Sequence, residues 1–593
     1  MVLRQLARHT ADDAVTTTFA LCGTRCCEYS RPRHFHDTRL FLAGIVEVAC
    51  GGVCTPACPH GLYTAALRIA ESAVTKRKFF KWFGIALLVL VLASALSLYG
   101  YGRFADRQRG PVSHVLPATA VATPIDKVVA PLQQAHVDQT GMVILPDNVD
   151  AFAVRALTAR AAGRSLDLQY YIWHADFTGN LLHNELLRAA DRGVRVRLLL
   201  DDMNIHGSDS VLAALDSHPL IEIRLFNPTR AREGTLMRGV EMVLRMFSIN
   251  RRMHNKAWIA DGRIAVVGGR NVGDEYFDAA RDTNFMDMDA ALMGPAVGQA
   301  EQVFDAYWNS PNALPLSALV TAKPQALEAL RGSLDAGMAS VRAHPYVERL
   351  KRSPSVRELM QGDRPVHWVS QARIVSDPPE KAEGAPPQAD WMTPVLIGEM
   401  AHAQRELKVI SPYFVPGDEG MRWIGNLRQR DVRVSILTNS LAANDVVAVH
   451  SGYAGYRVPL LHQGVRLHEL KPMGKPDGSL FGSSGASLHT KAFVVDDSSG
   501  FIGSFNLDPR SMNLNTEMGL LFNDRVVTAE LERLYNHKIS APVSYRVTLE
   551  QGELRWHDDA AQPPEVWSRE PAASVWRRGA AAVMGWLPLE SQL

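Results

Sequence analysis

Two segments of the chain place the same five residue types at the same spacing, HxKx4Dx6GxxN. With each fixed residue at roughly one chance in twenty, one match arises in about one of several thousand chains of this length. Two matches therefore exclude coincidence and point to one site built twice. The matched residues are His254, Lys256, Asp261, Gly268 and Asn271 in the first segment and His489, Lys491, Asp496, Gly503 and Asn506 in the second.

These residue types suit transfer of a phosphoryl group. A neutral imidazole can attack phosphorus, and a protonated imidazole can give its proton to the leaving alkoxide. Ammonium and amide groups can stabilise the phosphate oxygens, on which charge builds in the transition state. Two histidines suffice for this chemistry, so the pattern requires no metal and no cofactor.

The spacing also indicates local geometry. Residues i and i+2 of a strand share a face, so each histidine points the same way as the lysine that follows it. The apolar residues after each lysine continue a core strand, and turn residues then lead into a return strand. This hairpin brings Asn271 and Asn506 back beside the two His-Lys pairs.

The twin motifs resemble those of the phospholipase D superfamily. The wider phrases are similar to bacterial cardiolipin synthases of the C type, and the resemblance covers about residues 140–593. It implies two halves that pack about a pseudo-twofold axis and combine their motifs in one active site. The phrases are LQYYIWH (168–174), NRRMHNK (250–256), GGRNVGDEY (268–276) and TNSLAANDV (438–446).

The resemblance implies a role for each motif residue. One histidine forms a covalent phosphohistidine, and the other acts as general acid and then as general base. We assign His254 as the nucleophile and His489 as the acid and base, although near-symmetry lets either imidazole serve. Asp261 and Asp496 complete the catalytic motifs, with turn or strand-cap roles as the alternative. The residues expected to hold the phosphate are Lys256, Asn271, Lys491 and Asn506.

Carboxylates are expected to orient the imidazoles through the ring nitrogen that does not react. Glu517 matches the position that the family uses for this task in its second half. In the first half we take Glu275 as the candidate, with the segment 286–289 (MDMD) as the alternative.

The elements that must position these residues alternate between strands and helices, which favours a mixed α/β layer fold. The phrase DRGVRVRLLLD (191–201) is echoed by QRDVRVSILTN (429–439), so an internal duplication is expected. The fold class is therefore two related α/β domains, each a mixed sheet flanked by helices. Predicted strands are 166–172, 194–200, 221–226, 407–410, 432–438 and 465–470, with a helix over 180–191.

Residues 82–101 carry no charge and have aromatic residues at both ends, which predicts a transmembrane helix. A buried core helix or the apolar part of a signal peptide is the alternative. Four basic residues precede the segment (Lys76, Arg77, Lys78 and Lys81) and three follow it (Arg103, Arg107 and Arg109). This balance favours a cytoplasmic N-terminus, with the catalytic domains on the periplasmic side of a bacterial inner membrane.

The first 75 residues match nothing in the family, and one hypothesis is that the true product starts near Val74. All six cysteines lie before residue 59, so the rest of the chain needs no thiol chemistry. The three from Cys50 to Cys58 could form a metal knuckle, but their spacing is loose and we expect no metal site.

The domain limits follow from these features. They are an extension (1–75), a transmembrane helix (82–101), a linker (103–139), a first domain (140–315), a helical connector (316–375), a second domain (376–545) and a tail with an amphipathic helix (546–593).

Two further segments mix apolar and basic residues. Residues 234–252 form either an amphipathic helix at the membrane interface or a helix packed on the core with its arginines outward. Residues 576–589 are too short to span a bilayer and are expected to lie on its surface, with Arg577 and Arg578 reaching towards water.

The expected activity is a cardiolipin synthase that transfers a phosphatidyl group to phosphatidylglycerol. Phosphatidylglycerol is the expected lipid partner and phosphatidylethanolamine a second candidate. Hydrolysis of phospholipids by the same site is the alternative, and an idle lipid-binding scaffold is disfavoured by the complete motifs. With 63 basic and 62 acidic residues the chain has a net charge of +1, which suits no nucleic-acid partner.

Overall fold

The computed structural model describes most of the chain from His60 onwards. The hypotheses about the six cysteines lie outside the described residues. Contacts divide the chain into two compact units, Met1–Val89 and Leu90–Leu593. The described residues are 60–593 without 119–120, 206, 233, 282, 339–342, 387, 473–486, 588–589 and 593.

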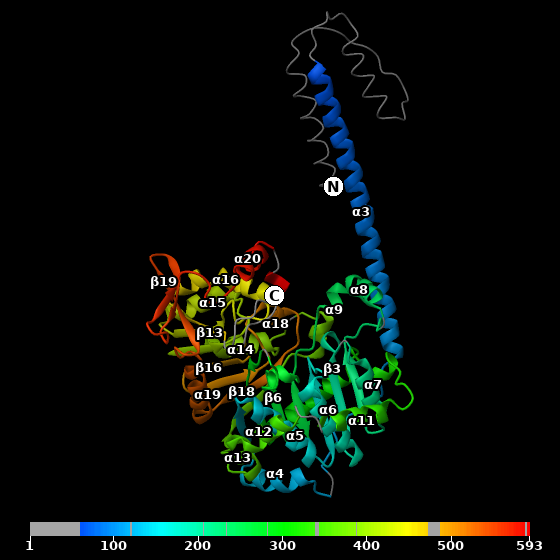
Figure 1. Cartoon of the computed structure of the whole chain (residues 1–593), viewed down its shortest axis with the longest axis vertical. Coiled ribbons are helices and arrows are strands. Elements are labelled where there is room, and N and C mark those ends of the chain that lie inside the picture. Colours follow the sequence, from blue (N-terminus) through cyan, green and yellow to red (C-terminus); the bar gives the residue numbers. More distant parts are fainter. Residues whose placement is uncertain are drawn as a thin grey trace, which may run out of the picture. The chain divides into compact units, whose positions relative to one another are not determined.

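The predicted transmembrane segment lies within the helix α3 (His60–Arg107), which Figure 1 labels. Over Phe79–Arg107 this helix is long and apolar enough to cross a bilayer, and it is the one such helix among the described residues. Its apolar side chains are largely exposed, which argues against the alternative of a buried core helix. The helix begins at His60, inside the segment assigned to the N-terminal extension.

Nine strands form the first sheet within the described residues, in the order β10-β1-β8-β6-β5-β2-β3-β4-β9. The neighbours β2, β3 and β4 are parallel, and both faces of such strands are buried, which explains continuous apolar runs such as 198–200. The strands are β1 (Thr140–Leu145), β2 (Ser165–Tyr170), β3 (Arg195–Asp201), β4 (Ile221–Phe226), β5 (Ala257–Ala260), β6 (Ile264–Gly268), β8 (Asp289–Met293), β9 (Ala313–Pro315) and β10 (His367–Val369).

The second sheet has ten strands in the described part of the chain, in the order β11-β18-β17-β16-β12-β13-β14-β19-β20-β21. It takes in β11 from the predicted connector and β20 and β21 from the predicted tail. The strands are β11 (Gln371–Ser376), β12 (Glu406–Ile410), β13 (Arg433–Asn439), β14 (Arg466–Leu470), β16 (Lys491–Val495), β17 (Ser499–Gly503), β18 (Met518–Asn523), β19 (Ser544–Glu550), β20 (Glu553–Asp558) and β21 (Glu565–Trp567).

The two sheets repeat one topology. The order β8-β6-β5-β2-β3-β4 in the first corresponds to β18-β17-β16-β12-β13-β14 in the second. In each sheet a parallel run meets an antiparallel hairpin, and that hairpin follows a motif histidine. The predicted mixed α/β fold with two repeated halves is thereby confirmed.

Helices flank the sheets (Figure 1). Several begin at side-chain caps: the Asp147, Asp176 and Asp524 carboxylates accept N–H groups of the first turns of α5, α6 and α19. The predicted helix 180–191 lies within α6. The helices are α4 (Pro124–Ala135), α5 (Asn148–Ala161), α6 (Phe177–Asp191), α7 (Asp209–Asp216), α8 (Thr235–Leu244), α9 (Met246–Ile249), α10 (Pro295–Trp308), α11 (Ala326–Met338), α12 (Ala343–Arg352), α13 (Pro354–Gln361), α14 (Met392–Ala401), α15 (Gly417–Gln429), α16 (Val447–Ala454), α17 (Arg457–His462), α18 (Pro509–Asn513), α19 (Arg525–Lys538) and α20 (Val575–Met584).

A shared apolar core joins the two halves. Strands β6 and β8 of the first sheet contact β17 and β18 of the second. Val267 and Ala290 on one side and Ile502 and Leu520 on the other belong to one buried cluster. Burial of this surface fixes the halves against each other, so residues from both can build one site.

The two segments predicted to form amphipathic helices each differ from one expectation. The alternative that 234–252 packs on the core is wrong for α8, because none of the residues of that helix is buried. The expectation that Arg577 reaches towards water is also wrong, since this side chain is buried and donates to the carbonyl of Leu441 at 2.8 Å.

Candidate active site

The two motif histidines lie where the halves exchange backbone hydrogen bonds. The His254 amide donates to the carbonyl of Thr516 at 2.9 Å, and the His489 amide donates to the carbonyl of Met286 at 2.8 Å. Each histidine thus lies beside a short segment of the opposite half. The residue that follows Thr516 or Met286 is a carboxylate in both cases.

The ends of two corresponding strands hold the segments that precede the histidines. At the end of β3, the Asp201 carboxylate accepts the amide of Met253 at 2.9 Å. At the end of β13, the Asn439 side chain accepts the amide of Leu488 at 2.9 Å and donates to its carbonyl at 3.0 Å. Asp201 and Asn439 are equivalent positions of the repeated phrase, so the duplication explains why both histidines are held alike.

The His254 imidazole pairs with Glu517. Its Nδ1 lies 2.8 Å from Glu517 Oε2, which leaves Nε2 as the nitrogen available to substrate. The hydroxyls of Ser504 and Ser511 donate to the same carboxylate. Burial raises the pKa of Glu517 to about 7, although the Lys256 ammonium acts to lower it. Burial and then the charges of Lys256 and Lys491 lower the pKa of His254 well below its ordinary value.

The His489 imidazole pairs with Asp287. Its Nδ1 lies 2.5 Å from Asp287 Oδ2. Burial alone would raise the pKa of Asp287, but the charges of His489 and Lys491 bring it below its usual value. Burial and Lys491 lower the pKa of His489, and Asp287 opposes them. The second imidazole therefore has an ionised partner.

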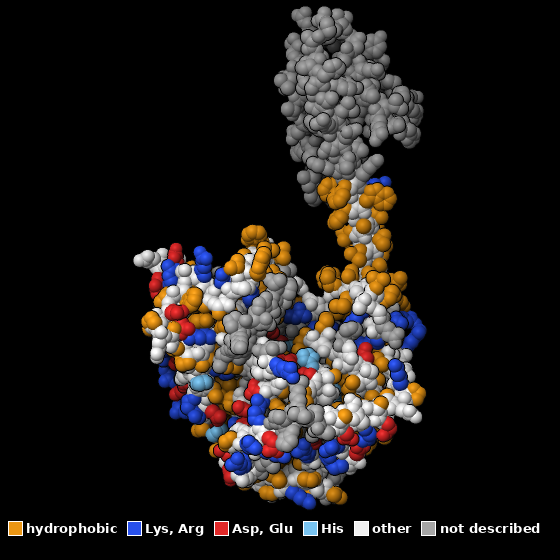
Figure 2. All heavy atoms as spheres, viewed as in Figure 1, with side chains coloured by type: hydrophobic (Ala, Val, Ile, Leu, Met, Phe, Trp, Pro, Cys, Tyr) orange, Lys and Arg blue, Asp and Glu red, His pale blue; other side chains and the backbone are white. Residues whose placement is uncertain are grey.

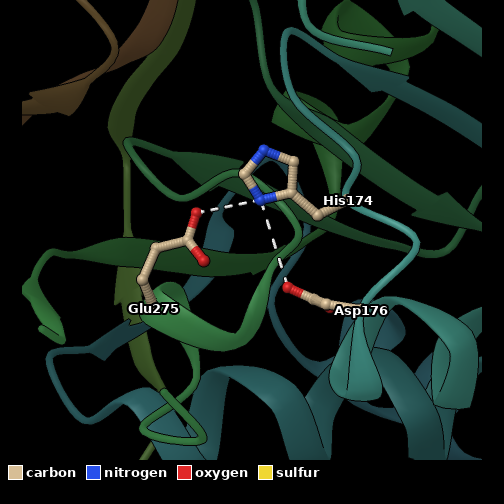
Figure 3. A group of neighbouring side chains, drawn as sticks. All are labelled: His174, Asp176 and Glu275. Carbon is tan, nitrogen blue, oxygen red and sulfur yellow. Dashed lines mark ion pairs between the residues drawn. The ribbon is translucent and has the colours of Figure 1, made fainter. Parts of the chain in front are cut away.

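Glu275 was the candidate to orient a motif histidine, but it contacts neither His254 nor His489. Its Oε1 lies 3.1 Å from Nδ1 of His174, as Figure 3 shows. The reason is a long-range strand pairing. The strand β7 (Phe285–Met286) runs beside β15 (Ser487–Leu488) of the other half and brings Asp287 to His489.

The sequence carries a weak indication of Asp287. Both orienting carboxylates are followed directly by a buried methionine, Met288 or Met518, at the start of a strand that returns to the hairpin. The alternative segment 286–289 contained Asp287. Nothing local to that segment shows that it pairs across the two halves.

The group of His174, Asp176 and Glu275 has the ligand types of a cation site (Figure 3). Its contacts have another explanation. Asp176 caps α6 by accepting the Gly179 amide at 3.0 Å, and its second oxygen accepts the Asp274 amide at 2.7 Å. The group therefore consists of a helix cap beside an ion pair.

The motif lysines are buried in the same site. Each Nζ donates to the carbonyl of the histidine two residues before it, at 2.7 Å for Lys256 and at short range for Lys491. Burial lowers the pKa of Lys491 to about 8 and that of Lys256 well below its usual value. Their electrostatic influence on His254 shows that groups from both halves act on one centre.

The two motif asparagines differ in their surroundings. Asn271 accepts the amide of Ile172 at 3.1 Å and donates to the Tyr276 hydroxyl at 2.9 Å. Asn506 is buried, and its Oδ1 has no hydrogen-bond partner among the described residues. Both ends of the Asn271 amide are thus bonded within the protein, whereas the Asn506 side chain has no such bond among the described residues, and its Nδ2 is the group that could donate to a phosphate oxygen.

The motif aspartates stabilise strands and do not contact the histidines. Asp261 accepts the amides of Gly163, Arg164 and Ser165, at the start of β2. Asp496 accepts the amides that lead into β12 at 404–406. Both lie at the far ends of the strands that follow the histidines. The catalytic assignment of Asp261 and Asp496 is therefore wrong, and the strand-cap alternative describes them.

Two tyrosines next to the histidines were missed as site residues. The ring of Tyr171 lies edge-on to His254 with centroids 4.9 Å apart, and that of Tyr276 lies edge-on to His489 at 5.4 Å. The Lys256 ammonium lies 5.4 Å from the Tyr171 ring. Both tyrosines lie in phrases that carry the family resemblance, 168–174 and 268–276, but nothing in those phrases separates a site residue from a core residue.

Comparison with known proteins agrees with this arrangement. The family described as cardiolipin synthase, PLD-like domain, matches residues 158–308 and 396–539, which cover the two motifs separately. Cardiolipin synthase C of Escherichia coli (strain K12) is 40% identical over 469 residues, or 78% of this chain and 98% of the relative. The chain belongs to the cardiolipin synthase family of phospholipase D-like proteins.

Other members of the cardiolipin synthase family are more distant. Cardiolipin synthase A of Pseudomonas putida (strain GB-1) is 26% identical over 62% of each chain. A solved structure of phosphatidylserine synthase from Haemophilus influenzae Rd KW20 aligns with a TM-score of 0.49 at 13% identity, covering 78% of this chain and all of that one. Family membership and the helix Phe79–Arg107 together indicate a membrane protein.

Proposed function

We propose that this chain is a cardiolipin synthase that moves a phosphatidyl group through a phosphohistidine to the free glycerol hydroxyl of phosphatidylglycerol. The observation that carries the proposal is the pair of buried imidazoles, each held by a carboxylate of the opposite half. The similarity to cardiolipin synthase C supports the choice of acceptor.

The first step forms the covalent intermediate. Nε2 of neutral His254 attacks the phosphorus of the donor phospholipid, and a P–N bond forms as the P–O bond to the head-group alcohol breaks. Protonated His489 gives its proton to the leaving alkoxide. Phosphatidylglycerol as donor releases glycerol, and phosphatidylethanolamine would release ethanolamine.

The second step reverses the proton transfer. His489, now neutral, takes the proton of the acceptor hydroxyl, whose oxygen attacks phosphorus while the P–N bond to His254 breaks. Lys256, Lys491 and Asn506 hold the non-bridging oxygens in both steps. Asn271 acts indirectly, by fixing the Tyr276 ring beside His489.

The surroundings support this assignment of the two histidines. The depressed pKa of His254 keeps it a free base, as a nucleophile must be. Burial and Lys491 lower the pKa of His489 as well, but the ionised Asp287 opposes that shift and so favours the protonated form that a general acid needs.

We further propose a single span in the bacterial inner membrane, with a cytoplasmic N-terminus and periplasmic catalytic halves. The charge balance around the apolar segment supports this orientation. We also keep 140–315 and 376–545 as the limits of the two catalytic domains, with β10, β11, β20 and β21 joining their sheets from the neighbouring segments.

The test is to express the chain in a host that lacks its own cardiolipin synthases and to analyse total lipids by mass spectrometry. We expect cardiolipin with the parent chain and none with His254→Ala. Accumulation of phosphatidic acid without cardiolipin would mean that water takes the intermediate and that the chain is a phospholipase D. No change in either lipid would contradict both activities.

A further inference from the structure

The first half exposes a patch of large apolar side chains. The helix α8 has no buried residue, and the chain continues through α9 with Phe247 83% exposed. This first patch comprises Leu236, Met237, Val240, Val243, Met246 and Phe247. A continuous exposed apolar surface of this kind marks a contact with another molecule or with a membrane.

The second half has its own apolar patch at α20. This helix buries one residue, Arg577, whose guanidinium donates to the carbonyls of Leu441 and Asn444. Arg577 therefore faces the protein together with Ala580, Ala581 and Met584, while the large apolar residues of the helix face outward. This second patch comprises Val575, Trp576, Val583, Trp586 and Leu587, with Trp586 84% exposed.

The first patch adjoins the end of the apolar helix α3. The guanidinium of Arg245, between α8 and α9, lies 3.2 Å from the ring centroid of Tyr101, and that of Arg230 lies 4.5 Å from the ring of Phe104. Because Phe79–Arg107 is the candidate membrane span, these contacts bring the first patch to the place where the chain leaves the bilayer.

The first patch borders a cavity of about 810 Å³, and the chain that follows α20 reaches the same cavity. Its lining includes Leu98 of α3, Phe247 of the first patch and Gln592 of the short helix η5 (Glu590–Gln592) that follows α20. The Gln592 side chain accepts a hydrogen bond from Asn250 at 2.8 Å. Asn250 also lines the cavity and lies four residues before His254.

We propose that these two patches bind the surface of the phospholipid bilayer, one from each half. Figure 1 places α8 and α20 towards the same end of the catalytic unit, and Figure 2 shows hydrophobic side chains gathered there. The large aromatic and aliphatic side chains suit the boundary between head groups and acyl chains. This inference deepens the proposed function by naming the surface from which the substrate is drawn.

The test measures the depth of labelled side chains in the full chain, reconstituted in vesicles of phosphatidylglycerol and phosphatidylethanolamine. Single cysteines at Phe247 and Trp586 carry the fluorophore NBD, with the six natural cysteines changed to serine. The matched control is Val128→Cys, because Val128 is a 66% exposed apolar residue on α4 at the opposite end of the unit (Figure 1).

We expect the fluorescence emission of NBD at positions 247 and 586 to shift to shorter wavelength when vesicles are present. The fluorophore should be quenched by spin-labelled lipid and shielded from aqueous iodide. The control should show the reverse. Met237→Cys and Val583→Cys repeat the test within each patch, so the result does not depend on one label. Iodide quenching equal to the control at both positions of a patch would overturn the inference for that patch.

The readout also separates this inference from the proposed function. Labels that lie in the lipid of a protein that makes no cardiolipin would uphold the membrane surface and contradict the activity. Labels that remain in water in a protein that makes cardiolipin would do the opposite.

Discussion

The two half-sites share a backbone plan but differ in electrostatics. Each motif histidine bonds through Nδ1 to a buried carboxylate of the other half. Beside His254, burial raises the pKa of Glu517 to about 7, so this carboxylate is partly neutral at physiological pH. Beside His489, the neighbouring cations bring the pKa of Asp287 below its usual value, so this carboxylate is charged. A duplicated motif can thus yield two histidines with different tasks.

The asparagines differ in the same way. Both polar ends of Asn271 bond to the protein, whereas the buried Oδ1 of Asn506 has no partner in the part of the chain that the structure describes. The motif residues are identical in type, and their neighbours decide what each one can do.

The largest expected effect is loss of either histidine. We expect His254→Asn and His489→Asn each to lower the rate of lipid transfer by at least about 10³-fold, because one variant lacks the nucleophile and the other the proton donor. The double variant should be no worse than either single one, since the two act as a unit. Cardiolipin formation in vesicles measures this. A single variant with a tenth of the parental rate would remove that residue from the mechanism.

Exchange of the two carboxylates for amides tests the electrostatic difference directly. We expect Asp287→Asn to cost about 10²- to 10⁴-fold and Glu517→Gln clearly less, because glutamine resembles the neutral form that Glu517 already populates. The rates of cardiolipin formation by the two variants, measured side by side, decide whether the two carboxylates differ. Equal losses would mean that the half-sites are electrostatically alike.

The pH dependence of activity tests the direction in which the Asp287 charge shifts the pKa of His489. His489 must be protonated in the first step, so activity falls as pH rises through its pKa. The negative charge of Asp287 raises that pKa, and Asp287→Asn removes the charge, so the alkaline limb should move to lower pH. Glu517→Gln should leave the profile near that of the parent below pH 7. An alkaline limb unmoved in Asp287→Asn would contradict the role of His489 as the acid.

The asparagines should separate catalysis from stability. We expect Asn506→Ala to lower kcat by about 10²-fold with an unchanged unfolding midpoint, as for loss of one donor to the transition state. Asn271→Ala should lower the free energy of unfolding by about 1–3 kcal/mol, because a buried amide and a hydroxyl lose their partner. Thermal unfolding and kcat are measured on both. Equal changes of kcat and of stability in the two variants would mean that Asn506 and Asn271 do not differ in role.

The smallest effect on activity is expected at the motif aspartates. Asp261→Ala leaves three backbone amides without an acceptor and should cost about 1–3 kcal/mol of stability, while activity at a temperature where the variant is folded changes little. Asp496→Ala should behave likewise. Loss of activity without loss of stability would return the aspartates to the catalytic machinery.

The sequence predicts the parts of this site that are local in the chain. The positions of His254 and His489, their lysines and the hairpins that follow come from spacing alone, and the echo of 191–201 in 429–439 predicts the repeated sheets. Asp287 could not be chosen over Glu275, because its position depends on the pairing of β7 with β15, which are about 200 residues apart in the chain. The roles of Asp261 and Asn271 depend on hydrogen bonds to distant backbone, which spacing does not encode.

The central claim is that His254, and not His489, carries the phosphatidyl group. The most direct test is a rapid detergent quench at alkaline pH, where the P–N bond survives, of the enzyme with a phospholipid donor that carries a labelled acyl chain, followed by peptide mass spectrometry. We predict that the parent chain carries a phosphatidyl adduct on His254 and that His254→Asn forms none. An adduct on His489 in the His254→Asn variant would contradict the assignment.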